Sequence, residues 1–301
     1  MSVRHDALVF GSDDELVAGT HDLIEQGLMV GDPVLVLGDE QGMGVLRKTW
    51  DDDPRISFMP QEQLYDKPMR ALASFQRMLD REAFTGHGLR VTGPVPFGNA
   101  PRTRRAWMIY EALVDRALAP YRLLSLCQYD TRTVAPDLVE HARATHERVV
   151  TPSGVGAGGV RRAEVLAALA EPDGPDALES APVVYGDLLT DVGDLRRLRA
   201  GMAPAPKDLA YAANEVATNG FEHGDPPVGV RLHRGDDSWL CVISDRGRGI
   251  ADPYAGVDSP FSGNPAPGGH GLWLARQLCD YLTIAADPSG RGTTVRLEYR
   301  A

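Results

Sequence analysis

Two short apolar runs constrain the fold of this chain more than any other feature. Residues 33–38 (PVLVLG) are continuously apolar, and the centre of residues 122–128 (RLLSLCQ) is interrupted only by Ser125. A strand with one face in water alternates apolar and polar residues, whereas a strand of a parallel sheet covered on both faces does not. These runs therefore predict an α/β domain with a mainly parallel sheet.

Short apolar runs alternate with helical patterns throughout the first half of the chain. Ser12 and Glu15 form the Ser-x-x-Glu pattern of a capping box, which marks the start of the first helix. The alternation predicts a first domain over residues 1–150. The expected strands are 6–10, 33–38, 55–59, 88–93 and 122–128, and the expected helices are 13–28, 68–85, 103–118 and 136–147.

The composition changes after residue 150. Residues 151–159 (TPSGVGAGG) have the composition of a flexible linker, and 171–176 contains helix breakers, so we expect a linker over 151–181 with a short helix near 161–170. From residue 182, helices and hairpin-like strand pairs fall in separate groups, which predicts an α+β two-layer sandwich over 182–301. Its expected strands are 228–234, 238–244, 283–287 and 293–299, and its expected helices include 190–201, the segment 214–224 and 271–282.

Charge and composition exclude several classes of protein. The net charge is −11, which argues against nucleic acid as the main partner, because phosphate binding needs a basic face. No apolar run approaches the roughly 20 residues of a membrane helix, and acids interrupt the N-terminus where a signal peptide would be apolar. We therefore expect a cytoplasmic protein without a membrane segment. Cys127, Cys241 and Cys279 lie far apart in apolar segments and are interpreted as buried thiols rather than metal ligands.

The helical pattern before residue 224 has two distinct faces. One face is apolar and should pack on a sheet; it comprises Leu209, Ala212, Ala213, Val216, Ala217 and Gly220. The other carries Asp208, Tyr211, Glu215, Asn219 and Glu222 at steps of three or four residues. Taken alone, this polar stripe fits a solvated helix face better than a binding site.

Three glycine motifs follow that helix. In 245–250 (DRGRGI) an acid precedes two alternate glycines, which lets the backbone approach a planar ligand while the carboxylate accepts a hydrogen bond. In 268–280 (GGHGLWLARQLCD) a glycine loop runs into a helix, whose N-terminal amides can bind phosphate. In 292–299 (GTTVRLEY) a glycine enters a strand. Each motif is weak by itself.

In this order and spacing, the helix and the glycine motifs resemble the ATP-binding fold shared by gyrase, histidine kinases, a heat-shock chaperone and MutL, known as the Bergerat type. The resemblance covers residues 182–301 and is closest to the anti-sigma-factor serine kinases, which carry a compact Glu-x-x-x-Asn helix and a GHGLWL-like segment. It implies ATP and Mg²⁺ as cofactors. No His-bearing dimerisation helix directly precedes this domain, so a two-component histidine kinase fits poorly.

The resemblance also implies a role for individual residues. Asn219 would bind the magnesium ion, and Glu215 would act as general base. Asp245 would accept a hydrogen bond from the adenine amino group with support from Thr293, and residues 252–268 would form a mobile lid. The remaining members of the implied cofactor site are Gly247 and Gly249 beside the base, and Gly269, Gly271 and Leu272 near the phosphates.

The first domain resembles the MEDS sensory domain, an α/β module distantly similar to RecA-like ATPases. The similar segments are 5–10 (HDALVF), 26–37 (QGLMVGDPVLVL), 110–121 (YEALVDRALAPY) and 126–131 (LCQYDT). Gly93-Pro94 stands where the family pattern has Gly-Glu, which puts a ligand role of that acid in doubt here.

Several polar residues of the first domain lie at strand or helix ends, where open α/β sheets bind ligands. We interpret them mainly as caps, surface charge and packing, and His5 as a structural polar residue rather than a ligand. They are Gln128, Tyr129, Asp130, Glu111, Arg102, Arg104 and Arg105.

These features together predict a cytoplasmic signalling regulator in which a sensory domain controls an ATP-binding domain. The kinase hypothesis is phosphorylation of a serine or threonine on a STAS-type anti-anti-sigma partner. The alternative is a nucleotide-gated module that sequesters a sigma factor or another regulator without kinase activity. Both expect an unknown small-molecule signal at the first domain and no direct contact with nucleic acid or membrane, and both leave a homodimer open.

Overall fold

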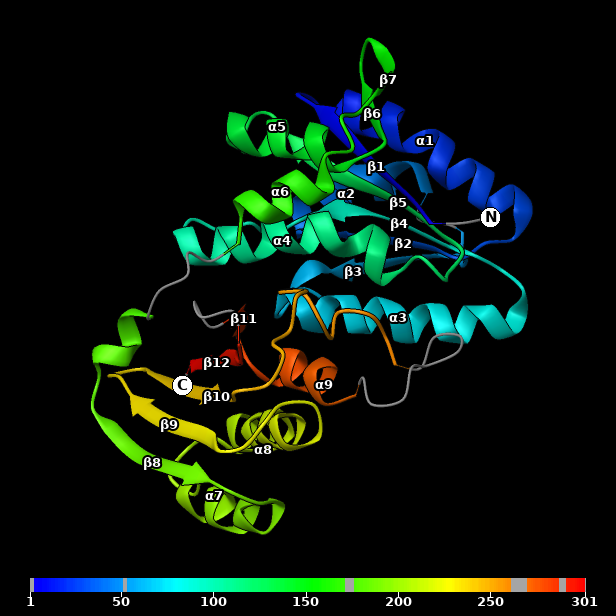
Figure 1. The fold of residues 1–301 in the computed structure, drawn as a ribbon. Helices are drawn as coiled ribbons and strands as arrows, with labels where there is room; N and C mark the ends of the chain where they lie inside the picture. Colours follow the sequence, from blue (N-terminus) through cyan, green and yellow to red (C-terminus); the bar gives the residue numbers. More distant parts are fainter. Residues whose placement is uncertain (1–2, 51–52, 171–175, 261–269, 287–290, 301) are drawn as a thin grey trace. The chain divides into compact units, whose positions relative to one another are not determined.

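The chain forms two compact units, residues 1–169 and residues 170–301. The computed structural model describes residues 3–50, 53–170, 176–260, 270–286 and 291–300, and Figure 1 shows the order of their helices and strands.

The N-terminal unit is built on a seven-stranded sheet in the order β3-β2-β4-β5-β1-β6-β7. All neighbouring strands are parallel except β6 and β7, which pair antiparallel. The prediction of a mainly parallel sheet is confirmed, and every residue of the apolar strand β2 is buried. The strands are β1 (Arg4–Phe10), β2 (Val34–Gly38), β3 (Ile56–Pro60), β4 (Leu89–Pro94), β5 (Leu123–Asp130), β6 (Arg148–Thr151) and β7 (Gly154–Ala157).

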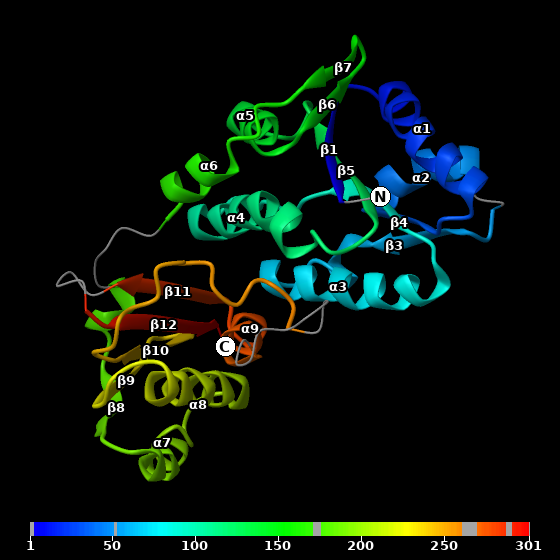
Figure 2. The same ribbon diagram turned by 45° about the vertical axis from the view of Figure 1, so that its right-hand side comes forward.

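The helices of this unit form two packed groups, α1 with α2, and α3 with α4, which in turn contacts α5. Right-handed crossovers place the first group on one face of the sheet and the second on the other, because the strand order reverses after β3; Figure 2 shows this layering. The helices are α1 (Asp13–Val30), α2 (Glu40–Trp50), α3 (Pro68–Thr85), α4 (Pro101–Ala117), α5 (Pro136–Thr145) and α6 (Arg162–Ala168).

The start of α1 shows how local sequence fixes an element. The Ser12 hydroxyl accepts a hydrogen bond from the Glu15 amide at 3.2 Å, as its capping pattern predicts. The Glu15 carboxylate in turn accepts from the Gly11 amide at 2.6 Å. Such a cap stabilises a helix by about 1 kcal/mol. The helix α2 was not predicted, because Gly42 and Gly44 weaken its pattern.

The structure differs from the predicted linker at residues 151–159. These residues form the end of β6 and the strand β7, with Thr151 paired to Gly154, and β6 itself lies beside β1. The glycines that suggested a linker serve a tight hairpin, in which Gly154 has φ +124°. The helix α6 then packs on α4 and α5, so the first unit extends to residue 169.

The C-terminal unit has a five-stranded sheet in the order β11-β12-β10-β9-β8, and all its strand pairs are antiparallel. The helices α8 and α9 pack on this sheet and on each other, which confirms the two-layer α+β class. The strands are β8 (Val183–Leu189), β9 (Val228–Arg234), β10 (Ser238–Ser244), β11 (Tyr281–Ala286) and β12 (Thr293–Arg300), and the helices are α7 (Leu195–Gly201), α8 (Lys207–Glu222) and α9 (His270–Leu278).

The helix α8 divides as its sequence predicts. All six residues of the predicted apolar face are buried, and Leu209, Ala212, Ala213 and Ala217 have no exposed surface at all. This face belongs to the core of the unit, which it shares with Val230, Leu232 and Leu297 of the sheet. The burial fixes the rotation of α8, so that Glu215 and Asn219 lie half-buried at its border.

Candidate functional site

The predicted ATP-binding motifs converge on one pocket of the C-terminal unit. Its volume is about 330 Å³, which falls at the lower end of the range of small-molecule sites. Its walls come from α8, β10, the loop after β10, α9 and β12. The lining residues are Val216, Asn219, Gly220, His223, Gly224, Ile243, Asp245, Gly249, Ile250, Ala255, Gly256, Leu272, Thr293 and Val295.

Asp245 is fixed in the wall of the pocket. It follows β10 directly, and its amide donates to the Thr293 carbonyl at 3.0 Å. Its Oδ1 accepts from the Gly247 amide at 2.8 Å, which orients the carboxylate. Gly224 packs against this carboxylate so closely that a Cβ there would lie 2.7 Å from the Asp245 Cγ. A side chain at residue 224 would therefore displace Asp245.

Glu215 and Asn219 face the start of α9. A Cβ on Gly271 would lie 3.1 Å from the Asn219 Nδ2 and 3.3 Å from the Glu215 Oε2. The two side chains lie on one face because residues four apart on a helix are stacked. Among the described residues, Asn219 lines the pocket and Glu215 does not, so Glu215 lies next to the cavity rather than in its wall.

The loop after β10 is anchored on α9. The buried guanidinium of Arg276 donates to the carbonyls of Ala255 and Pro253, at 2.7 Å each. Gly256 has φ +81°, and a Cβ there would lie 2.7 Å from the backbone carbon of Leu272. Of the predicted lid over 252–268, the first residues are thus tied to α9, and residues 261–268 lie outside the described residues.

The structure brings most of the predicted cofactor residues together. Asn219, Asp245, Gly249, Leu272 and Thr293 line the pocket; Glu215, Gly247 and Gly271 lie beside it. Gly269 lies outside the described residues. The roles assigned to these residues stay predictions. Sequence reasoning did not single out His223, Gly224 or Arg276, because a lone histidine, glycine or arginine in a helix or turn carries no pattern.

The polar candidates of the N-terminal unit have partners within the unit. The Gln128 amide donates to the Thr92 hydroxyl at 2.9 Å. Asp130 pairs with Arg132 at 2.8 Å, which holds the pKa of the Asp130 carboxyl below its usual value. Arg104 pairs with Asp137 at 2.7 Å, and Arg105 donates to the Leu169 carbonyl. Arg102 also has a partner. These contacts agree with the interpretation as caps and packing.

The departure at Gly93-Pro94 lies at the end of β4. A Cβ on Gly93 would lie 2.6 Å from the Cβ of Leu37, so glycine is needed where β2 and β4 approach. Pro94 stands opposite Gln128 in the parallel register.

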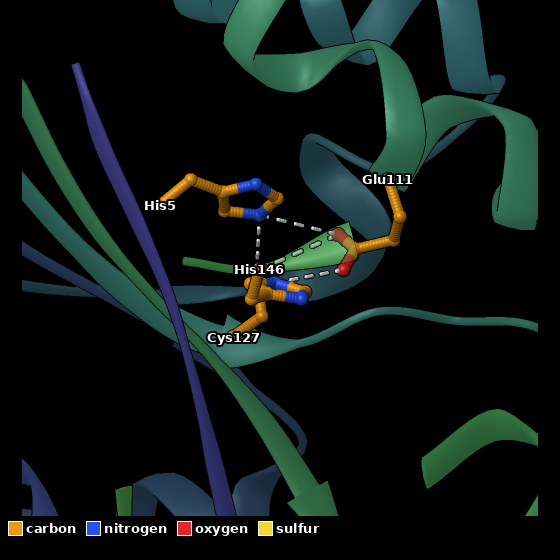
Figure 3. Close-up of side chains that lie close together, drawn as sticks. All are labelled: His5, Glu111, Cys127 and His146. Carbon is orange, nitrogen blue, oxygen red and sulfur yellow. Dashed lines mark hydrogen bonds and ion pairs between the residues drawn. The ribbon is translucent and has the colours of Figure 1, made fainter. Parts of the chain in front are cut away.

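A second group of polar side chains is enclosed inside the N-terminal unit. His5 of β1, Glu111 of α4, Cys127 of β5 and His146, which follows α5, place one nitrogen, oxygen or sulfur atom each within 4.8 Å of one another. His5, Glu111 and His146 have no exposed surface, and Cys127 is 9% exposed. Figure 3 shows the carboxylate of Glu111 pointing toward both imidazole rings. No sequence motif predicts this group, because its members are far apart in the chain, between His5 and His146.

Glu111 is the centre of this group. The Tyr129 hydroxyl donates to its Oε2 at 2.5 Å, and the Cys127 thiol lies 3.5 Å from its Oε1. Burial by itself would raise the pKa of the Glu111 carboxyl, but His146 and His5 outweigh this effect and lower the pKa to about 2. Burial raises the pKa of the Cys127 thiol well above its usual value. An ionised carboxylate in a closed interior needs a positive partner.

None of the described helices is both long and apolar enough to span a membrane.

Comparison with known proteins assigns both units. Residues 4–147 match the family model of the MEDS (methanogen/methylotroph, DcmR sensory) domain, and residues 190–299 match that of the histidine kinase-like ATPase domain. No curated protein matches the chain. Among solved structures, the cytoplasmic domain of EssC shares 12% identity over 49% of this chain and 30% of its own length, with a TM-score of 0.31.

A prototypical ATPase from the type III secretion system of pathogenic bacteria shares 11% identity over 55% of this chain and 62% of its own length, with a TM-score of 0.32. The chain thus spans less than two thirds of both proteins. The two family matches, each on one compact unit, identify the chain as a MEDS domain followed by a histidine kinase-like ATPase domain.

Proposed function

We propose that the C-terminal unit binds Mg-ATP and transfers the γ-phosphoryl group to a serine or threonine of an anti-anti-sigma partner, under control of the N-terminal unit. A sensory domain joined to a histidine kinase-like ATPase domain indicates a signalling regulator. The anti-sigma-factor type of kinase is supported by the compact Glu215/Asn219 helix and by the GHGLWL sequence at 269–274, of which HGLWL forms the start of α9.

One observation carries the proposal. Glu215 and Asn219 face the N-terminal turn of α9, while Asp245 lies fixed in the wall of the same pocket. Apolar walls from Ile243, Ile250 and Val295 suit a flat base. With Oδ1 of Asp245 engaged by Gly247, its Oδ2 is available to accept from an adenine amino group.

The part of the pocket beside Asn219 and α9 suits the phosphates. Amides at the N-terminus of α9 can donate to phosphate oxygens, and the Asn219 carboxamide offers a hard oxygen ligand of the kind Mg²⁺ accepts. The magnesium ion would supply charge neutralisation of the phosphates. Gly271 keeps the backbone of α9 close to Asn219 and Glu215, because a larger residue would crowd both side chains.

Glu215 suits a general base because it lies one turn from Asn219 and outside the pocket wall. There it can meet a hydroxyl group that enters from a partner protein. In the proposed transfer, Glu215 takes the hydroxyl proton while the hydroxyl oxygen forms a bond to the γ-phosphorus. The bond to the bridging oxygen breaks, and ADP leaves.

The second candidate function is a nucleotide-gated module that sequesters a sigma factor or another regulator. The same position of Glu215 favours it, because a nucleotide can fill the pocket without contacting this carboxylate. The two functions therefore share the pocket and differ only in what Glu215 does.

A capture experiment in the native cell extract tests both functions. The full chain is used as bait with and without ATP, the bound proteins are identified, and their phosphorylated residues are mapped. A serine or threonine phosphorylated only with ATP supports the kinase. ATP-dependent capture without phosphorylation contradicts the kinase and supports sequestration. Capture that is the same for wild type with ATP, without ATP and for Asp245→Asn contradicts both.

A further inference from the structure

The histidines of the enclosed group turn their Nε2 atoms toward its centre. The Nδ1 of His146 lies 2.9 Å from the Ala142 carbonyl, which can only accept, so Nδ1 carries a proton. In the neutral ring, Nε2 is then a bare lone pair. It is buried without a hydrogen-bond partner and lies 3.3 Å from the Glu111 Oε2. Two acceptors that face each other in a closed interior are stabilised by a positive charge between them, which is either a proton or a metal ion.

His5 is supported from outside in the same way, although its Nε2 has the Cys127 thiol as a hydrogen-bond partner. Its Nδ1 lies 3.0 Å from the Asp115 carboxylate, and its Nε2 lies 3.2 Å from the Cys127 sulfur and 3.8 Å from the Glu111 Oε1. A histidine that donates one ring N–H to a carboxylate or carbonyl presents the other nitrogen in a fixed direction, as metal-binding histidines do. Both rings of the group have this outer support.

The separations of the donor atoms are close to those of a small tetrahedral site. Bonds of about 2.0–2.3 Å, as zinc makes to nitrogen, oxygen and sulfur, place ligand atoms about 3.3–3.8 Å apart. The Nε2 of His5 lies 3.2 Å from the Cys127 Sγ and 3.8 Å from the Glu111 Oε1, and the Cys127 Sγ lies 3.5 Å from that same oxygen. The Nε2 of His146 lies 3.3 Å from the other Glu111 oxygen, Oε2. One ligand atom from each of the four residues lies within 4.8 Å of the others.

The charges also balance around a divalent ion. A Glu111 carboxylate and a Cys127 thiolate supply two negative charges, and two neutral imidazoles supply none. The nearby Asp115 is already offset by Arg162, at 2.9 Å. A divalent cation therefore leaves the enclosed group neutral, which is the state that a buried site favours.

We propose that the N-terminal unit binds one Zn²⁺ ion through His5, Glu111, Cys127 and His146. Two nitrogens, one oxygen and one sulfur suit zinc, whereas magnesium and calcium take oxygen ligands only. Four protein ligands leave no open position, as in structural zinc sites. The bound ion links β1, α4, β5 and the chain between α5 and β6. Asp115 positions His5 through its contact with Nδ1.

This proposal revises the sequence-based interpretation of Cys127 and His5. Cys127 is buried, as expected. Unlike Cys241, it lies 3.2 Å from an imidazole nitrogen and 3.5 Å from a carboxylate oxygen. The pKa of the Cys241 thiol is raised to about 12 by burial alone. Cys241 therefore provides a matched control, since it is a buried thiol that belongs to no group of metal-ligating side chains among the described residues.

The experiment measures bound metal in the full chain. Because the group is enclosed, apo protein is produced in metal-depleted medium, and Zn²⁺ or Co²⁺ is supplied during expression or refolding. Elemental analysis counts the ions, and the Co²⁺ form is examined for a thiolate-to-cobalt charge-transfer band and for the intense visible bands of tetrahedral cobalt. The variants are Cys127→Ala, His146→Gln, Asp115→Asn and the control Cys241→Ala, with folding checked by circular dichroism.

The proposal predicts one zinc per chain and a charge-transfer band in wild type and in Cys241→Ala, and neither in folded Cys127→Ala. Asp115→Asn should keep the band and weaken zinc binding about 10- to 100-fold. Folded wild type without zinc and without the cobalt band overturns the proposal; a proton on His5 then holds the group together. A stoichiometric ion that survives in folded Cys127→Ala and His146→Gln also overturns it. Should those two variants fail to fold, the Asp115→Asn affinity and the wild-type cobalt spectrum decide.

Discussion

The pocket of the C-terminal unit and the enclosed group of the N-terminal unit contain similar side chains in opposite settings. The pocket is a cavity of about 330 Å³ whose polar residues Asn219 and Asp245 are half-buried. The cavity next to the enclosed group is about 20 Å³, room for about one water molecule. The pocket can therefore hold a molecule of substrate size, whereas the space beside the enclosed group can hold only an ion, a proton or a single water molecule.

The two regions also differ in how their binding groups come close to a ligand. Around the pocket, glycines remove side chains so that backbone and ligand can come near, as Gly224 and Gly271 do. In the enclosed group the side chains themselves contact one another, and helices and strands far apart in sequence supply them. A site for an exchanging ligand thus depends on short local motifs, and a closed site depends on the whole fold.

The largest effect is expected from a substitution of Glu215 beside the pocket, which should change the rate of phosphoryl transfer without affecting the enclosed group. Glu215→Ala should reduce phosphoryl transfer about a hundred- to ten-thousandfold, which is the usual worth of a positioned general base, while ATP affinity is preserved. Glu222→Ala, at an exposed position of the same helix, is the control. Transfer is measured with radiolabelled ATP and the captured partner. If Glu215→Ala abolishes ATP binding instead, the division of roles along α8 is wrong.

A smaller effect is expected at Asp245. Asp245→Asn replaces a charge-assisted hydrogen bond worth about 1.5–3 kcal/mol, so ATP affinity should fall roughly ten- to a hundredfold. Calorimetry on the folded variant measures the affinity. Asp236→Asn removes the same charge at an exposed turn and should leave the affinity unchanged. Equal losses in both variants would mean that general electrostatics, and not the adenine contact, governs binding.

A substitution of Gly224 tests whether its close packing against Asp245 holds that carboxylate in place. A methyl group there would lie 2.6 Å from the Gly220 carbonyl and 2.7 Å from the Asp245 Cγ. Gly224→Ala should therefore move Asp245 and weaken ATP binding about tenfold, within the range lost when its hydrogen bond is removed. Gly186→Ala, where a methyl group has only ordinary contacts at 3.8 Å, is the matched control in the same unit. An unchanged affinity in Gly224→Ala would show that Asp245 is not fixed by this contact.

The smallest effect concerns an ion pair outside both regions. Glu179 accepts from Arg296 at 2.8 Å and from the Asp176 amide at 3.1 Å. Burial opposes its charge, but these hydrogen bonds outweigh burial and lower the pKa of Glu179. Its stabilisation is therefore fully present above the unfolded pKa near 4.5 and is lost as the pH falls through the lower folded pKa.

Glu179→Gln should cost about 1 kcal/mol of unfolding free energy at pH 6, and the cost should shrink as the pH falls below 4.5. Urea denaturation of the wild type and of Glu179→Gln at pH 6 and pH 4 measures the difference in unfolding free energy. A difference that grows toward pH 4 would contradict the assignment.

The sequence predicted the C-terminal unit in more functional detail than the N-terminal unit. The helix face of Leu209, Ala212 and Val216 and the motifs around Asp245 and Gly271 are contiguous, so periodicity and spacing disclose them. The strand β8 was not predicted, because it is an edge strand in which only Leu189 is buried, so its sequence lacks a clear apolar pattern. The hairpin of β6 and β7 was interpreted as a linker because glycine composition is the same for a turn and for a flexible chain.

The enclosed group could not be predicted from sequence. His5 and His146 meet only because β1 and the chain before β6 lie side by side, and Glu111 joins them only through the packing of α4. Such contacts depend on the tertiary fold and leave no pattern in sequence. The position of Arg276 beneath the loop at Pro253 was hidden for the same reason.

The most direct test of the central claim is the affinity of the full chain for ATP with and without Mg²⁺, compared between wild type and Asn219→Ala by calorimetry. Wild type should bind ATP more tightly with Mg²⁺, and Asn219→Ala should lose most of this gain because it lacks the oxygen ligand. Absence of ATP binding by the wild type would contradict the account. An increase in ATP affinity on adding Mg²⁺ that is equal in the wild type and in Asn219→Ala would contradict it as well.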